Sequence, residues 1–455
     1  DHPKALGLLG AIAVVTDNIE AGVDLISRSI ALKSGDPDAH INLGSALILL
    51  GRHSEALEHF DQALALNPDN HAAHSNRGIC LRHLGQTKES INSFRRAIAL
   101  KPELAIAHYN LSFALLSNGQ EKEGLAEMEW RWGSPTFDFT MRDFSEPMWD
   151  GTTNLNDKTL FLWPEQGLQD ITIWASEIPK LATKAEHCII SVYPKLASLF
   201  SRSFPQVKVQ IDNGEISSGF GDFDVHLPFG SLFRALKTKP TSIVPAFLVP
   251  DPERIAYWKQ RLAELGPEPS VGISWKSPIL NPQREPNYTR IDEWAPVFAL
   301  PFNFINLQSG DIDEDLSWAK RELGITVHNF KKIDLFDDLD DVAALSAALD
   351  LSIAVSTAAA AITAGVGTPT WVINWVQSPW NNFLLAPRGP SVTRFDRDTG
   401  ESWAAVFEAM AKQLQNTFNL PIRLADKGPA TNRQNLNLRL DEAVKHPSAR
   451  HLAKG

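Results

Sequence analysis

Two hydroxyl side chains stand where a buried strand is predicted to run directly into a helix. Ser356 and Thr357 follow the apolar run 351–355 and precede the alanine run 358–361. The first amide groups of a helix have no partner within the helix and carry a partial positive charge, so such a turn can bind a phosphate. The alternative is that these hydroxyl groups only cap the helix.

A lysine follows another predicted strand in the same way. Ser274, Trp275 and Lys276 stand at the end of the strand 271–275, and a lysine there could neutralise a diphosphate or a departing nucleotide. The next loop, 278–290, adds three side chains that could close over a ligand: Arg284, Tyr288 and Arg290. The alternative is a solvated surface loop with scattered basic residues.

Two further positions could meet the same ligand. Gln308 and Ser309 follow the predicted strand 302–307, on the same edge as that lysine. Asp338 stands with Asp337 at the start of a predicted helix, where carboxylates commonly cap the first turn. A contact between Asp338 and a ribose or base is the less favoured alternative.

Carboxylates also lie between a strand and a helix nearer the N-terminus. The segment 165–170 contains Glu165 and Asp170, which we expect to face the space between two domains. A carboxylate in such a space could take the proton from an acceptor hydroxyl. For Asp170 the alternative is a cap on its own helix.

The sequence predicts no metal site and no cofactor. His71 and His74 share a helical face without a third ligand, which is typical of a protein surface. A chain with 54 acidic residues matches an Asp-x-Asp pattern by chance, here at 311–313 and 396–398.

The candidate side chains need sheets whose strands end at one edge. Short apolar runs alternate with helical stretches from Lys158 onward, which indicates parallel strands covered by helices on both faces. We expect one α/β domain over 158–250 and another over 251–415, with ligands at the carboxyl ends of the strands. The predicted strands are 159–163, 187–192, 207–211, 271–275, 302–307, 351–355 and 370–374, and the predicted helices include 171–182 and 341–349.

A helical repeat precedes the sheets. Asn42, Asn76 and Asn110 recur every 34 residues, in matching frames that also contain Gly51, Gly85 and Gly119. This period is typical of tetratricopeptide (TPR) repeats, which are pairs of helices stacked into a curved solenoid. We expect the solenoid over 1–132, an aromatic-rich linker over 133–157, and a polar tail over 416–455.

The three asparagines could contact a bound polypeptide. An Asn side chain both donates and accepts hydrogen bonds, so a ladder of Asn42, Asn76 and Asn110 could bind an extended peptide backbone of any sequence. The alternative is that Asn at this position of the repeat serves the packing of the helices.

Composition narrows the class of partner and the compartment. The chain has 455 residues, of which 43% are hydrophobic, and a formal net charge of -11, which argues against nucleic acid or an anionic membrane as the main partner. Cys80 and Cys188 lie far apart, which favours a reducing compartment. The longest apolar run, 5–15, is too short to span a bilayer. No basic leader precedes it, so the sequence shows no signal peptide. We therefore expect a cytoplasmic protein.

Short motifs spread along the chain form a specific set. They are Glu129-Trp-Arg-Trp132, Trp149-Asp-Gly151, Glu165-Gln-Gly-Leu168 with Asp170, Val271-Gly-Ile-Ser-Trp275, Leu307-Gln308, Ala348-Leu-Asp350, and Ser356-Thr357 through Gly367-Thr-Pro369. Over nearly its full length the chain resembles bacterial TPR proteins fused to a heptosyltransferase-like glycosyltransferase of the GT-B fold, which has two Rossmann-like domains in tandem. Soluble flagellin glycosyltransferases belong to this type, and the asparagine ladder is similar to that of the O-GlcNAc transferases.

The resemblance implies an inverting, metal-independent glycosyltransferase whose co-substrate is a nucleotide sugar. In such proteins the TPR part is thought to hold flagellin while the GT-B part transfers a nonulosonic acid from a CMP donor to Ser or Thr. The resemblance also implies that the donor lies against the second α/β domain and that Asp170 is the catalytic base.

Three positions depart from the family pattern. Gln169 replaces the second Gly of Gly-Leu-Gly-Asp, and Ser356 and Ala361 replace the Asp and His of Asp-Thr-Ala-x-Ala-His. These changes argue against an ADP-heptose site and leave either another donor, such as a CMP-sugar, or a loss of catalysis. The rival hypotheses are a TPR scaffold with an inactive GT-B domain and, less favoured, an enzyme that acts on a small glycan or a lipid-linked sugar.

Overall fold

The computed structural model describes residues 2–212, 214, 222–239, 245–277, 287–375, 391–397 and 402–420. The chain divides into one compact unit, Asp1–Phe407, and a second unit, Glu408–Gly455. Helix α18 (Trp403–Thr417) crosses this boundary, and the other elements discussed below belong to the first unit. Arg284, Asp398 and residues 421–455 of the expected tail lie outside the described residues.

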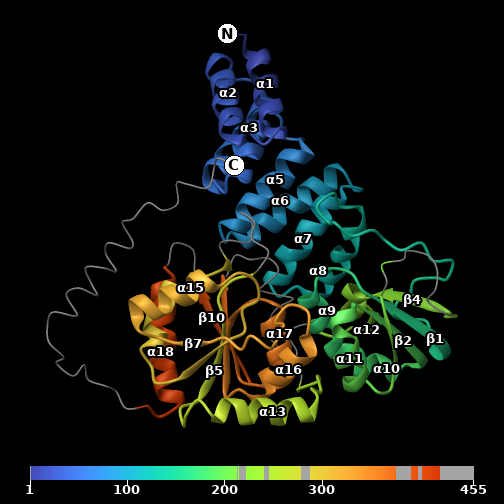
Figure 1. Ribbon diagram of the computed structural model, residues 1–455. Coiled ribbons are helices and arrows are strands. Elements are labelled where there is room, and N and C mark those ends of the chain that lie inside the picture. Colours follow the sequence, from blue (N-terminus) through green and yellow to red (C-terminus); the bar gives the residue numbers. More distant parts are fainter. Residues whose placement is uncertain are drawn as a thin grey trace, which may run out of the picture. The chain divides into compact units, whose positions relative to one another are not determined.

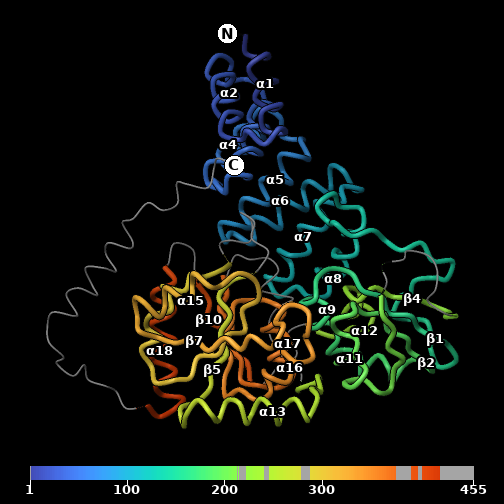
Figure 2. Tube along the Cα trace, viewed as in Figure 1, coloured from blue at the N-terminus to red at the C-terminus, as the bar shows by residue number. Residues whose placement is uncertain are grey.

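Successive helix pairs form the N-terminal array, as Figures 1 and 2 show. The helices are α1 (Pro3–Val15), α2 (Ile19–Leu32), α3 (Pro37–Leu49), α4 (His53–Leu66), α5 (His71–His83), α6 (Thr87–Leu100), α7 (Ala105–Ser117) and α8 (Glu121–Glu127). The predicted helical array is therefore confirmed.

The repeated glycines have two distinct roles in this array. Gly51, Gly85 and Gly119 lie in the turns between paired helices with φ of 72°, 74° and 75°, a left-handed conformation that glycine adopts without strain. Gly44 lies against the ring of Phe60, where an added Cβ would come within 2.7 Å of the ring. The turn glycine returns every 34 residues, and the close approach returns at Gly78 against Phe94, which is why the repeat is visible in the sequence.

The segment after the array is packed against the protein. A turn of 3-10 helix, η1 (Met128–Gly133), follows α8. Trp149 is buried, and its backbone N–H donates to the carbonyl of His226 over 2.8 Å. The aromatic-rich linker therefore extends the hydrophobic core.

The first sheet has four parallel strands in the order β3-β2-β1-β4. They are β1 (Leu155–Trp163), β2 (Ala185–Val192), β3 (Lys208–Ile211) and β4 (Val225–Pro228). The chain passes outward from β1 to β3 and then returns to the other side of β1, so a topological switch point lies between the carboxyl ends of β1 and β4. The sequence predicted the first three strands but not β4, which is only four residues long.

The helices of this sheet correct one prediction. They are α9 (Leu168–Trp174), η2 (Ala175–Glu177), α10 (Ile178–Ala182), α11 (Pro194–Ser203), η3 (Phe229–Ser231) and α12 (Leu232–Leu236). The single helix predicted over 171–182 is in fact interrupted by η2. Pro179 lacks an amide hydrogen and cannot continue the hydrogen bonds of a preceding helix, and it stands in the first turn of α10, where no such bond is needed.

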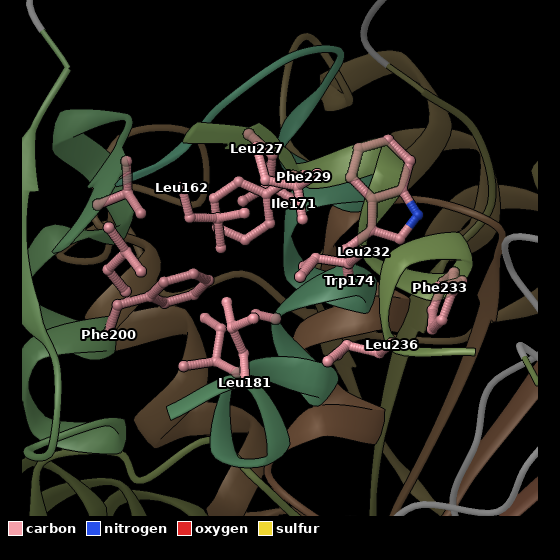
Figure 3. Packing of buried hydrophobic residues seen from close by; sticks show 14 of the residues in the cluster. Leu162, Ile171, Trp174, Leu181, Phe200, Leu227, Phe229, Leu232, Phe233 and Leu236 are labelled. Atoms are coloured by element: carbon pink, nitrogen blue, oxygen red, sulfur yellow. The ribbon is translucent and has the colours of Figure 1, made fainter. Parts of the chain in front are cut away.

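The core around the first sheet joins its strands to its helices. Figure 3 shows Leu162 of β1 and Leu227 of β4 packed with Ile171 and Trp174 of α9 and with Phe200 of α11. All five side chains are fully buried. Burial of one such side chain contributes about 1.5–3 kcal/mol, so this cluster fixes α9 on the sheet.

The second sheet has six parallel strands in the order β10-β9-β8-β5-β6-β7. They are β5 (Ser270–Ser274), β6 (Asn303–Asn306), β7 (Val327–His328), β8 (Leu351–Val355), β9 (Thr370–Trp375) and β10 (Val392–Arg397). The chain passes from β5 outward to β7 and then crosses to β8 on the other side of β5. A second switch point therefore lies between the carboxyl ends of β5 and β8.

Helices and short turns connect these strands. They are α13 (Pro252–Ala263), η5 (Ile291–Trp294), α14 (Ala295–Phe298), α15 (Asp313–Trp318), the π-helical η6 (Ala319–Leu323), α16 (Leu339–Ala348), α17 (Ala358–Gly365) and α18 (Trp403–Thr417). The predicted strands and the helix 341–349 agree with β5, β6, β8, β9 and α16 to within a few residues, whereas β7 and β10 were not predicted. The fold is thus an α-helical array followed by two parallel α/β sheets, as expected.

One buried cluster links the helices of the two sheets. Leu196 and Phe200 of α11 belong to the same hydrophobic cluster as Val342 of α16 and Ile362 of α17. This packing holds α9 and α11 beside the helices that flank β8. Over the described residues, no helix is both long and apolar enough to cross a membrane.

Candidate functional site

The switch point between β5 and β8 gathers most of the predicted ligand-binding residues. Ser274 is the last residue of β5, and it pairs with Ala354, one residue before the end of β8. Lys276 and Ser356 therefore follow two neighbouring parallel strands at the same edge. Ligands in open α/β sheets bind outside the carboxyl ends of the strands at such a point.

Gln308 fixes the backbone at this edge. Its side-chain oxygen accepts hydrogen bonds from Ser274 Oγ (3.1 Å), the Trp275 N–H (3.1 Å) and the Lys276 N–H (2.9 Å). Its Nε2 donates to the carbonyl of Ser309 over 2.9 Å. Gln308 is buried, so its role here is to hold the end of β5 in place.

An aspartate that the sequence analysis missed pairs with Lys276. Asp315 Oδ2 accepts from Lys276 Nζ at 2.6 Å and from the indole nitrogen of Trp275 at 2.9 Å. The lysine side chain keeps 27% of its surface exposed, so its charge is paired but accessible. The ring of Trp275 is fully buried, so only its backbone lines the edge.

The first turn of α17 has no side-chain cap. Thr357 is the N-cap residue with extended backbone, yet it caps no amide of the helix. Its hydroxyl instead lies 3.3 Å from the carbonyl of Val355. The cap interpretation therefore does not describe this hydroxyl, and the first turn of α17 keeps the features of an anion site.

Helix α9 reaches this switch point from the first sheet. Gln169 Nε2 donates to Ser356 Oγ over 2.9 Å. Asp170, the next residue, is half-buried and accepts the N–H of Gly167 at 3.2 Å, as a carboxylate does in the first turn of a helix. Asp170 therefore caps its own helix, as the alternative interpretation stated, and it is adjacent in sequence to Gln169, which contacts Ser356.

Glu165 does not face a space between domains, contrary to our expectation. Its carboxylate is buried and accepts from Arg131 Nε (2.9 Å), Arg131 Nη2 (2.7 Å) and the Gly230 N–H (2.8 Å). Arg131 Nη2 also donates to Ser231 Oγ over 2.9 Å. The Arg131–Glu165 pair lies where the ends of β1 and β4 diverge, so an arginine from the end of the helical array occupies the switch point of the first sheet.

The electrostatics of this pair support an ionised contact. Burial alone would lower the pKa of Arg131, but the carboxylates of Glu165 and Glu129 outweigh it and raise that pKa above its ordinary value. Glu165 is therefore a structural residue and a poor candidate for proton transfer. The motif that contains Arg131 was visible in the sequence, but nothing there indicated its partner.

The basic loop after β5 returns to the same edge. Thr289 donates to the carbonyl of Trp275 through its N–H (2.9 Å) and its hydroxyl (3.0 Å). Tyr288 is half-buried, whereas Arg290 is exposed and pairs with Asp292. The predicted residues Tyr288 and Arg290 therefore stand on either side of Thr289, which is anchored beside β5.

Asp338 caps a helix, as the favoured interpretation stated. Its Oδ1 accepts the N–H of Asp341 at 3.0 Å, in the first turn of α16. Both of its oxygens also accept from Arg254 Nη1, at 3.0 and 2.8 Å. These contacts account for the carboxylate without a nucleotide.

The asparagine ladder lies on alternate helices of the array. The ladder consists of Asn42 on α3, Asn76 on α5 and Asn110 on α7. Helix α5 contacts both α3 and α7. Asn42 is exposed, Asn76 Nδ2 donates to Ser45 Oγ over 3.2 Å, and Asn110 Nδ2 donates to the carbonyl of Ile106 over 2.9 Å. Packing within the array thus accounts for one hydrogen bond of Asn76 and one of Asn110. An Asn side chain can form further hydrogen bonds.

His74 and Asp396 have structural partners. His74 Nε2 lies 2.9 Å from the carbonyl of Pro68, and Asp396 accepts from Asn374 and Arg394. Within the described ranges, no group of three or more His, Cys, Asp or Glu side chains could hold a metal ion.

Comparison with known proteins identifies the repeats. Models of the tetratricopeptide repeat match residues 37–70, 59–92 and 80–119. The helices from α3 to α7 therefore form TPR repeats, which are modules for binding other proteins.

One curated protein is similar over more than half of this chain. Protein FlbA of Caulobacter vibrioides is 34% identical over 287 residues, which are 59% of this chain and 48% of that protein. The chain thus spans about half the length of this relative.

Three solved structures each match about a quarter of this chain. A crystal structure of MamA is 20% identical with a TM-score of 0.27, over 28% of this chain and 75% of that one. The first TPR of Spaghetti (RPAP3), bound to an HSP90 peptide, is 20% identical with a TM-score of 0.25, over 26% and 93% of the two chains. YrrB, a TPR protein with an unusual peptide-binding site, is 22% identical with a TM-score of 0.25, over 27% and 62%.

Proposed function

We propose that the chain is an inverting, metal-independent glycosyltransferase that modifies Ser or Thr of a polypeptide held by its TPR array. The observation that carries the proposal is the switch point between β5 and β8. There the uncapped first turn of α17 and the accessible Lys276 follow neighbouring strands, an arrangement suited to the phosphate of a nucleotide sugar.

The acceptor side of the reaction would lie at α9. Asp170 follows Gln169 in the sequence, and the side chain of Gln169 contacts Ser356 at the proposed donor site. Asp170 accepts the N–H of Gly167 over 3.2 Å. A carboxylate at this position could take the proton from the acceptor hydroxyl.

The chemistry is a single in-line displacement. The acceptor hydroxyl oxygen forms a bond to the anomeric carbon while the bond from that carbon to the phosphate oxygen breaks. The hydroxyl proton passes to Asp170, and the nucleotide departs with the electron pair of the broken bond. Lys276 and the amides of α17 would stabilise the phosphate as its negative charge grows.

We further propose a CMP-linked nonulosonic acid as the donor and flagellin as the acceptor, with the reaction in the cytoplasm. A nonulosonic acid carries its own carboxylate. The hydroxyl and amide of the neutral Ser356–Gln169 pair add no negative charge beside it, whereas an aspartate at position 356 would repel it.

Calorimetric titration with CMP and ADP tests the donor site. We expect CMP to bind more tightly than ADP, and Lys276→Met to weaken CMP binding about tenfold, which corresponds to ~1.4 kcal/mol. Lys180→Met is the matched control, because Lys180 is exposed on α10, outside the switch point. If neither nucleotide binds, the donor site is wrong.

Mass spectrometry of flagellin from cells that carry Asp170→Ala tests the base. We expect the glycan mass to disappear from flagellin in these cells. Glu186→Ala is the control, because Glu186 is exposed near the amino end of β2, at the opposite edge of the first sheet. An unchanged glycan mass would remove Asp170 from the mechanism.

The second candidate function is a TPR scaffold whose sheets are inactive. The filled switch point of the first sheet favours it, because Arg131 and Glu165 leave no place there for a ligand. The pairing of Lys276 with Asp315 also favours the scaffold, because the charge of this lysine already has a partner. The same calorimetric titration separates the two candidates, since a scaffold binds neither CMP nor ADP.

A further inference from the structure

An arginine of the TPR array has no acidic partner among the described residues. Arg82, near the end of α5, is half-buried, and its Nε and Nη1 atoms are buried without a hydrogen-bond acceptor. Burial lowers its pKa to about 10, which still leaves the guanidinium charged at neutral pH. On the same helix, Arg77 pairs with Asp61 at 2.6 Å. A partly buried cation without a counter-charge favours the binding of an anion.

The neighbours of Arg82 add hydrogen-bond donors. Arg82 Nη2 lies 3.4 Å from His83 Nε2. A guanidinium cannot accept, so His83 Nε2 is the acceptor and neutral His83 carries its proton on Nδ1. That Nδ1 is also buried without a partner. Arg82 and its neighbour His83 therefore each keep a buried donor without a partner.

The histidines do not add charge. The ring of His53, at the start of α4, stacks on His83 with centroids 4.2 Å apart and an interplanar angle of 12°. Burial, followed by the nearby charge of Arg82, lowers the pKa of both imidazoles below the ordinary value. Both rings are therefore neutral at neutral pH, and Arg82 supplies the single positive charge of this cluster.

The cluster lies beside the asparagine ladder. The Arg82 Cζ atom is 6.0 Å from the centroid of the Phe113 ring on α7. Phe113 stands three residues after Asn110, which places it one helical turn further along the same helix. The cluster thus reaches from α5 to the turn of α7 that follows the ladder.

We propose that Arg82 and His83 bind the carboxylate of an Asp or Glu side chain in a polypeptide that lies along the TPR array. The carboxylate accepts from the guanidinium and from His83 Nδ1, while Phe113 and His53 shield the contact from water. This site rests on the polypeptide-binding part of the proposed function and is independent of sugar transfer. It would select acidic polypeptides, which an asparagine ladder alone does not do.

Selection from a random dodecapeptide library displayed on phage tests the site. The library is selected on the full chain, on Arg82→Gln and on Arg77→Gln, which removes an arginine of the same helix that already has a partner. We expect the unchanged chain and Arg77→Gln to enrich peptides with an acidic residue at one fixed position, and Arg82→Gln to lose that enrichment. Arg82→Gln removes an unpaired charge, so we expect its melting temperature to stay at or above that of the unchanged chain.

A selected peptide, synthesised with its acidic residue as Glu or Gln, completes the test. We expect the Gln form to bind the unchanged chain about tenfold more weakly, and both forms to bind Arg82→Gln equally. Acidic enrichment that survives in Arg82→Gln, or peptides selected without any acidic preference, would overturn the carboxylate site while leaving polypeptide binding intact. If no peptide is selected, polypeptide binding itself is wrong and the site falls with it. Should Arg82→Gln not fold, the comparison of the two peptides on the unchanged chain still decides whether a carboxylate is recognised.

Discussion

Gln169 donates from its side-chain nitrogen to the hydroxyl of Ser356 over 2.9 Å, and this bond joins the first turn of α9 to the end of β8. Both residues depart from the pattern of the family that the chain resembles, in which Gly and Asp stand at these positions. A glycine could not make this bond, because it has no side chain. The two departures therefore form one matched contact, which favours an altered site over two unrelated losses.

Removal of either side of this contact should have a non-additive effect. We expect Gln169→Ala and Ser356→Ala each to lower the free energy of unfolding by about 0.5–1.5 kcal/mol, since each loses the same hydrogen bond. The double variant should lose little more than either single variant, with a coupling energy of about 0.5 kcal/mol or more. Urea denaturation of the four proteins measures this coupling. Strictly additive losses would show that the contact contributes nothing to stability.

The buried Arg131–Glu165 pair should be the most sensitive polar contact between the helical array and the first sheet. We expect Arg131→Met to destabilise the chain by roughly 3–5 kcal/mol, because it leaves Glu165 buried without its partner. The double variant Arg131→Met, Glu165→Leu should recover much of this loss, since no unpaired charge remains. Thermal denaturation measures both effects.

An exposed ion pair provides the control for that experiment. Arg95 and Glu123 join α6 to α8 at 2.7 Å, and their side chains are 47% and 42% exposed. We expect Arg95→Met to cost less than about 1 kcal/mol, because solvent screens such pairs. Equal losses for Arg131→Met and Arg95→Met would mean that burial of the pair has no energetic consequence.

His226 should make the chain less stable in mild acid. Its ring is buried and accepts from the indole nitrogen of Trp163 over 3.1 Å, and burial lowers its pKa to about 4. Between about pH 6.5 and 4 the unfolded chain binds a proton at this position while the folded chain does not, so stability falls as the pH falls through this range. The full effect is roughly 3 kcal/mol, and it does not grow further below about pH 4.

Replacement of this histidine isolates its contribution. His226→Asn keeps an oxygen that can accept from Trp163 but cannot bind a proton in this range. We expect the difference in unfolding free energy between the two proteins to shrink as the pH falls from 7 to 4, as measured by urea denaturation at each pH. The other histidines are common to both proteins, so their contributions cancel. A difference that is constant with pH would contradict the lowered pKa.

Local patterns in the sequence were sufficient for most elements of the fold. The 34-residue period follows from the turn at Gly51, which each repeat needs anew, and from the close approach at Gly44, which recurs at Gly78. The strands β5, β8 and β9 are buried almost throughout and so consist mainly of apolar residues. Short strands such as β7, with two residues, give no apolar run and were missed.

The partners of the charged residues could not be predicted, because they depend on the tertiary fold. Glu165 was expected to face a space between domains, but its pairing with Arg131 depends on how the end of the helical array meets β1 and β4. Asp315 contacts Lys276 across 39 positions of sequence, and nothing local distinguishes it from its acidic neighbours. By contrast, the placement of Lys276 and Ser356 at one edge followed from strand order alone.

The asparagine ladder should matter for polypeptide binding more than for folding. Asn42 is exposed, and Asn76 and Asn110 each make one neutral hydrogen bond within the array, so we expect the triple alanine variant to lose about 1–3 kcal/mol of stability. If the side chains also bind a peptide backbone, the same variant should raise the KM for the acceptor polypeptide about tenfold or more and leave kcat nearly unchanged, as expected for loss of uniform binding. Asn92→Ala is the matched control, because Asn92 is exposed on α6, outside the helices that carry the ladder. Steady-state kinetics with flagellin as acceptor measures both constants, and an unchanged KM in the triple variant would assign these asparagines to packing alone.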